Sequence, residues 1–184
     1  MKIISLRNIA ILAFLLSLVA ACGGGGGGGV STTPSQPTTA VLTLSTAVTG
    51  TIPSGTMING YEVTVTLPAG VTVKTMPGLS ETAAGVVTAS GQASGADLAF
   101  GVYTAATGTF PGTVKVFIAQ VDPSGAGFDP GEFCKVTGDI APGVFLSESD
   151  FVPPTLDDAT GIDASESTVI LTGELSLTGT AVIH

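Results

Sequence analysis

Strict alternation of apolar and polar residues, broken at short intervals by glycine and proline, most restricts what this chain can fold into. Residues 61–67 (YEVTVTL) and 114–118 (VKVFI) place an apolar side chain at every second position. A period of two indicates a β-strand with one buried face. Further strand-like runs occur at residues 42–45, 98–102, 132–136 and 169–178. Several short strands and no convincing helix predict an all-β sandwich or barrel.

Asn59 and Gly60 come directly before the alternating run at residues 61–67. An Asn-Gly pair fits either a tight hairpin turn or a bulge within one long strand. Residues 56–58 are too short for a convincing separate partner strand. The sequence therefore favours the bulge.

The first 21 residues have the organisation of a secretion signal. Lys2 and Arg7 precede an apolar run at residues 9–19, and small residues lead to Cys22. The run is shorter than the roughly 20 residues that cross a hydrocarbon core, and it fits a cleavable signal peptide. Residues 18–22 (LVAAC) resemble the lipobox of bacterial lipoproteins. The resemblance implies that Cys22 is lipidated and anchors an exported cell-envelope lipoprotein to a membrane; the alternative is an ordinary secretion signal followed by a free cysteine.

Residues 22–40 are expected to form a tether before a folded domain at residues 41–184. Seven glycines follow the cysteine, and residues 30–39 (VSTTPSQPTT) are polar with two prolines. Such a composition cannot build a core. Among lipoproteins the residue after the cysteine influences sorting. Gly23, in place of aspartate, implies the outer membrane, with the domain facing the periplasm or the cell surface.

The charge of the chain argues against nucleic acid as a partner. Without residues 1–21, three lysines stand against 14 acidic residues, which gives a net charge of −11. A phosphate backbone is repelled by such a surface, and no basic stripe offsets the repulsion. Nucleic-acid binding is therefore not expected.

Few residues have the chemistry that catalysis needs. His184 is the only histidine, so an activated nucleophile has no nearby imidazole. If Cys22 carries lipid, Cys134 has no disulfide partner and is expected to be a buried, inert thiol, with a reactive thiol as the alternative. One histidine and one free cysteine cannot form a zinc tetrad. The chain is therefore not expected to be an enzyme.

Several segments resemble cohesin-like domains. Residues 52–56 (IPSGT) lead into residues 60–68 (GYEVTVTLP) and residues 70–73 (GVTV). Residues 112–119 (GTVKVFIA) resemble a strand of that family in which a lysine stands between two β-branched residues, and residues 127–136 resemble the adjoining turn and strand.

The resemblance spans roughly residues 40–152. It implies a jelly-roll β-sandwich of about nine strands, related in fold to some carbohydrate-binding modules. It also implies a non-catalytic role in docking another protein, such as a dockerin module.

After Val152 the sequence departs from the cohesin-like pattern. Residues 153–163 are longer and more acidic than a simple connection needs. Carboxylates are ligands that Ca²⁺ prefers, so the segment is a weak calcium candidate, and a merely solvated loop is the alternative. The spacing fits no EF-hand loop. The candidate ligands are Asp157, Asp158, Asp163 and Glu166.

Lys115 and Phe117 are the candidate partner-binding residues, because they lie opposite the apolar face of their strand. Phe117 is either an exposed contact residue or packed beneath a second layer. Carbohydrate binding is the second hypothesis, but sugar-binding faces use exposed aromatic rings, and the chain has no tryptophan and only Tyr61 and Tyr103. Tyr61 is expected in the core, and Tyr103 at the surface. A structural envelope lipoprotein without a ligand is the third hypothesis.

Overall fold

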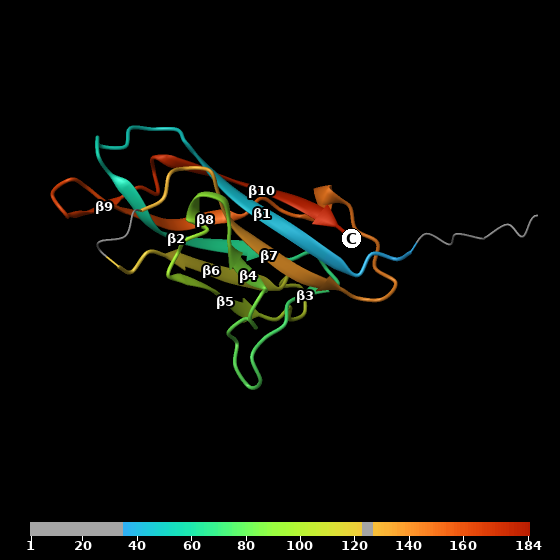
Figure 1. Ribbon diagram of the computed structural model, residues 1–184. Helices are drawn as coiled ribbons and strands as arrows, with labels where there is room; N and C mark the ends of the chain where they lie inside the picture. The colour runs from blue at the N-terminus through green and yellow to red at the C-terminus, as the bar shows by residue number, and fades with distance from the viewer. Residues whose placement is uncertain (1–34, 123–126) are drawn as a thin grey trace, which may run out of the picture. The chain divides into compact units, whose positions relative to one another are not determined.

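Two five-stranded antiparallel sheets face each other in the computed structural model, which describes residues 35–122 and 127–184. Sheet A has the order β10-β1-β7-β3, with β4 also paired to β7, and sheet B has the order β5-β6-β2-β8-β9 (Figure 1). The strands are β1 (Thr39–Val48), β2 (Met57–Thr66), β3 (Val71–Thr72), β4 (Val87–Ala89), β5 (Leu98–Thr104), β6 (Thr113–Ala119), β7 (Glu132–Ile140), β8 (Thr155–Ile162), β9 (Thr168–Ile170) and β10 (Leu175–Ile183).

The predicted all-β sandwich is confirmed. The described residues contain no α-helix, only the short 3₁₀ turns η2 (Gly91–Ala93) and η3 (Glu148–Asp150). They hold ten strands, where the sequence predicts about nine. The compact unit runs from Gln36 to His184.

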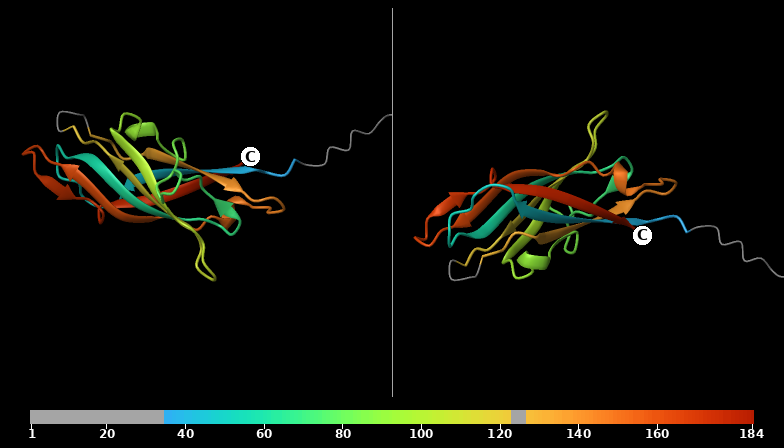
Figure 2. Two further views of the ribbon diagram at one scale, coloured as in Figure 1. Left: turned by 90° about the horizontal axis from the view of Figure 1, so that it is seen from below. Right: turned by 90° about the horizontal axis from the view of Figure 1, so that it is seen from above.

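The core lies between the two sheets and is built by the alternating positions of the strands. In β6 every second residue is fully buried, and β1 and β2 show the same alternation. Burial of apolar area contributes about 25 cal/mol per Å², so this inner layer is the main source of stability. Figure 2 shows the two layers from the two sides of the sandwich. The largest fully buried side chains include Phe133, Leu44, Ile58, Ile118 and Leu171.

Tyr61 lies in this core, as predicted. Its ring stacks on Phe133 with centroids 4.2 Å apart, and its hydroxyl forms a 3.1 Å hydrogen bond with the buried hydroxyl of Thr46. Burial raises the pKa of Tyr61, while the hydrogen bond with Thr46 opposes the shift and the charge of Asp129 adds to it. The polar end of the ring is therefore satisfied inside the sandwich.

β1 joins the beginning and the end of the unit. It pairs with β10 on one side and with β7 on the other. The backbone amides of Thr38 and Thr39 both donate to the carbonyl of His184, at 2.7 and 3.1 Å. The start of β1 and the end of β10 consequently lie side by side (Figure 1).

The acidic segment after Val152 is mostly a strand. The sequence predicts an extended connection there, but β8 pairs along β2 and lies inside sheet B. Its core-facing residues are Leu156, Ala159 and Gly161, which do not keep one alternation, because a register shift at Glu62/Val63 places two residues between Leu156 and Ala159.

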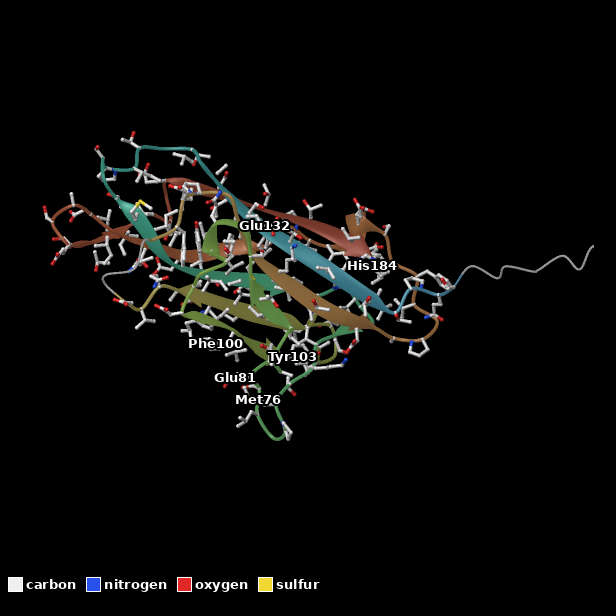
Figure 3. All side chains as sticks on the ribbon, in the orientation of Figure 1. Met76, Glu81, Phe100, Tyr103, Glu132 and His184 are labelled. Atoms are coloured by element: carbon white, nitrogen blue, oxygen red, sulfur yellow. The ribbon has the colours of Figure 1, made fainter. Side chains whose placement is uncertain are left out.

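Two further strand predictions were wrong in phase or extent. Residues 169–178 do not form one strand, because the chain turns at residues 171–174 and passes from β9 in sheet B to β10 in sheet A. Tyr103 is not on the exposed face: it packs partly against the core, and Phe100 and Val102 face outward instead. Figure 3 marks Phe100 and Tyr103 on β5.

Candidate functional site

In four adjacent strands of sheet B, the side chains that alternate with the core-facing ones point outward. They form a continuous surface, here called the outer face of sheet B. The register aligns these side chains in rows that run across β5, β6, β2 and β8. The first row holds Leu98, Ala119, Gly60 and Thr160; the second holds Phe100, Phe117, Glu62 and Asp158; the third holds Val102, Lys115, Thr64 and Thr155.

An aromatic pair lies near the centre of this face. Phe100 and Phe117 are directly opposite in the register, with ring centroids 4.9 Å apart and an interplanar angle of 13°. Parallel rings this close are stacked on each other, so each covers one side of its neighbour. Both rings are half-buried. Phe117 is thus an outward-facing residue shielded in part by Phe100, and residues 35–122 and 127–184 form no second layer over it.

Lys115 is held by two neighbours on the same face. Its ammonium group pairs with the carboxylate of Glu62 on β2 and lies 5.9 Å from the centroid of the Phe117 ring. The hydrogen bond with Glu62 raises the pKa of Lys115; desolvation lowers it, and the charges of Glu62 and Asp157 raise it further. Both predicted partner-binding residues therefore lie in one cluster, and the charge of Lys115 is already compensated.

The carboxylates outnumber the ammonium group on this face. Asp157 Oδ2 accepts a hydrogen bond from the Thr64 hydroxyl at 2.6 Å, and Asp158 Oδ1 accepts one from the Thr172 hydroxyl at 2.9 Å. Among the described residues, Asp157, Asp158 and Glu62 supply three carboxylates on this face, against the single ammonium group of Lys115. The face is acidic.

A shallow hollow of about 260 Å³ opens beside the aromatic pair. Its floor is formed where Gly60 stands opposite Ala119, because neither residue has a side chain large enough to fill the row. Leu98, Phe100, Phe117 and the carboxylates of Glu62 and Asp158 surround it. The hollow cannot be recognised in the sequence, since only the register of β2 and β6 brings residues 60 and 119 together.

The bulge predicted at Asn59-Gly60 is confirmed, and it explains the position of the hollow. β2 runs through this point, and its register with β8 shifts between Ile58 and Gly60. A Cβ atom added at Gly60 would lie 3.0 Å from the Thr160 hydroxyl oxygen. The glycine thus keeps two neighbouring strands close and leaves the surface open above them.

The structure separates the four candidate calcium ligands. Asp157 and Asp158 lie on β8 and bind threonine hydroxyls, while Asp163 accepts amide hydrogens from Ser165 and Ser167 in the β8–β9 turn. Glu166 occupies the same turn with a φ of 61°. Residues 35–122 and 127–184 contain no group of three or more His, Cys, Asp or Glu side chains placed to hold a metal ion. We do not propose a calcium site.

Cys134 is the buried thiol that the sequence predicts. Its side chain is fully buried in β7, and burial raises its pKa to about 12, although a hydrogen bond from the Thr88 backbone opposes the shift. A thiol needs its thiolate form to act as a nucleophile. Cys134 therefore serves packing.

Cys22, the signal segment and most of the tether lie outside the described residues. In the part of the chain that is described, no helix has the length and apolar character needed to span a membrane. Comparison with protein-family models, with curated proteins and with solved structures finds no match for this chain.

Proposed function

We propose that this chain is a bacterial envelope lipoprotein that presents a non-catalytic β-sandwich for contact with another protein. The observation that carries the contact role is the outer face of sheet B, where a stacked aromatic pair, an open hollow and unbalanced carboxylates lie together. Exposed apolar groups rimmed by polar ones mark interaction sites more often than inert surface.

The jelly-roll, cohesin-like type is part of the proposal. It is supported by the way the chain alternates between the sheets: β1 is in sheet A, β2 in sheet B, β3 and β4 in A, β5 and β6 in B, β7 in A, β8 and β9 in B, and β10 in A. The similarity of residues 52–73 and 112–136 to cohesin-like segments supports the same assignment.

Anchoring through Cys22 is supported by the signal-like sequence before it and by the glycine-rich stretch after it. Two or more acyl chains hold a protein stably at a bilayer, since each buried methylene contributes about 0.8 kcal/mol. The anchor would place the sandwich at the outer membrane, facing the periplasm or the cell surface.

The anchor is tested by fractionating bacteria that express the full chain. The native chain is expected in the membrane fraction and to incorporate labelled fatty acid, whereas a Cys22→Ser chain is expected in the soluble fraction. Cys134→Ser is the matched control and should remain membrane-bound. Membrane retention of the Cys22→Ser chain would contradict the anchoring proposal.

The contact role is tested with the immobilised full chain and a lysate of its own organism. Retention of a defined protein should be lost with Phe117→Ala and kept with Thr43→Ala, which changes the outer face of sheet A. Equal retention by both variants would exclude the outer face of sheet B as the contact surface.

A further inference from the structure

We infer that the outer face of sheet B binds an extended polypeptide segment that carries an aliphatic side chain and, two positions away on the same side of the segment, a lysine or arginine. This inference rests on the proposed contact role of the face and names the chemistry of its partner.

The hollow supplies the aliphatic subsite. Its floor of Gly60 and Ala119 and its walls of Leu98 and Phe117 are apolar, and its volume of about 260 Å³ suits a single aliphatic side chain. Leu98 is 41% exposed, so apolar area remains in water until a partner covers it. A side chain inserted there would bury area on all these residues at once.

The carboxylates supply the cationic subsite. Asp158 borders the hollow. Asp157, the residue before it in β8, lies at the bulge where the register with β2 shifts. Each uses one oxygen for a threonine hydroxyl, and no described residue donates a hydrogen bond to the second oxygen of either. Lys115 offsets only part of their charge, because its ammonium group pairs with Glu62 and one cation stands against three carboxylates. A lysine or arginine of the partner fits this position.

The same features argue against the other occupants. A second copy of the chain would place three carboxylates against three carboxylates, and an anionic lipid surface would be repelled in the same way. A sugar ring stacks best on a broad exposed aromatic face, but the rings of Phe100 and Phe117 are half-buried against each other, and the chain has no tryptophan. The charge of −11 would also steer a basic segment toward the protein.

Synthetic peptides provide the test. Fluorescent peptides of one length, with a Ser/Gly background, carry leucine and lysine two positions apart; in two further peptides serine replaces the leucine or glutamate replaces the lysine. Anisotropy titration with the full chain is expected to give an affinity about tenfold higher for the leucine–lysine peptide than for either of the others. The part of the affinity that depends on the lysine should fall as the salt concentration rises.

Two variants locate the binding. Ala119→Leu fills the hollow from the solvent side and should weaken binding of the leucine–lysine peptide about tenfold. Asp158→Asn keeps the acceptor for Thr172, removes the charge and should reduce the lysine preference. Thr43→Leu and Asp139→Asn make the same kinds of change on sheet A and should leave the affinity within about twofold.

Each contrary result has a distinct meaning. Unchanged peptide binding by Ala119→Leu, or equal binding of the glutamate peptide, overturns the inference, and so does failure of all three peptides to bind. Binding of cellohexaose that Ala119→Leu abolishes would keep the face as a binding site but overturn the polypeptide partner. Loss of protein capture by Phe117→Ala would in each case still support the broader contact role.

Discussion

The thiol of Cys134 offers a quantitative test of the sandwich interior. In a Cys22→Ser chain it is the only thiol left, because the chain has two cysteines. Burial raises its pKa from 9.0 to about 12. At pH 8 the thiolate fraction is then about one in ten thousand, compared with about one in ten for the unfolded chain. The native thiol should therefore react about a thousandfold more slowly with Ellman's reagent, and more slowly still because its side chain is fully buried.

The assay follows absorbance of the released thionitrobenzoate in buffer and in 6 M guanidinium chloride, each at pH 8. A native rate within tenfold of the denatured rate would refute the reasoning, since it would require an accessible thiolate in β7.

The same shift predicts a pH dependence. Because the folded state keeps the proton to higher pH, the free energy of unfolding should fall as pH rises from about 9 toward 12. A Cys134→Ala chain should lack this component of the decrease, as measured by urea unfolding at a series of pH values.

Two further predictions concern stability and are measured by urea unfolding of the full chain. Tyr61→Phe removes the 3.1 Å hydrogen bond to Thr46 and should cost about 1 kcal/mol, whereas an unchanged midpoint would mean that the hydroxyl pair contributes nothing. Gly101→Ala places a Cβ atom 2.9 Å from a methyl of Val114 and should cost about 1–3 kcal/mol through overpacking; Gly95→Ala, whose Cβ meets open space, is the control and should be neutral or slightly stabilising. Equal effects at the two glycines would contradict the packing explanation.

Strands with branched apolar residues on their inner face were predictable from the sequence. β2 and β6 alternate over their length because Val63, Val65, Val114 and Val116 all face the core. β8 was not predictable in this way. Two of its inward residues, Ala159 and Gly161, are small, and the bulge beside Asp157 puts Leu156 out of phase with them.

The candidate site was predictable only in part. Lys115 and Phe117 are identifiable because they occupy the alternate positions of an obvious strand. Their partners are not, since Phe100 and Glu62 reach them only through the pairing of β5 and β2 with β6. Tyr103 shows the same limit: one strand's alternation gives two faces, but the neighbouring sheet decides which of them is covered.

The position of β1 has a mechanical consequence. A pull applied at Gln36 loads β1 along its own axis. β1 is hydrogen-bonded to β10 on one side and to β7 on the other. Both antiparallel ladders would have to slide as a whole, because such a load shears many hydrogen bonds together and does not peel them one by one. If a partner holds sheet B while the other end of the chain is fixed, the sandwich is loaded in shear along β1, and its resistance is set by its unfolding rate.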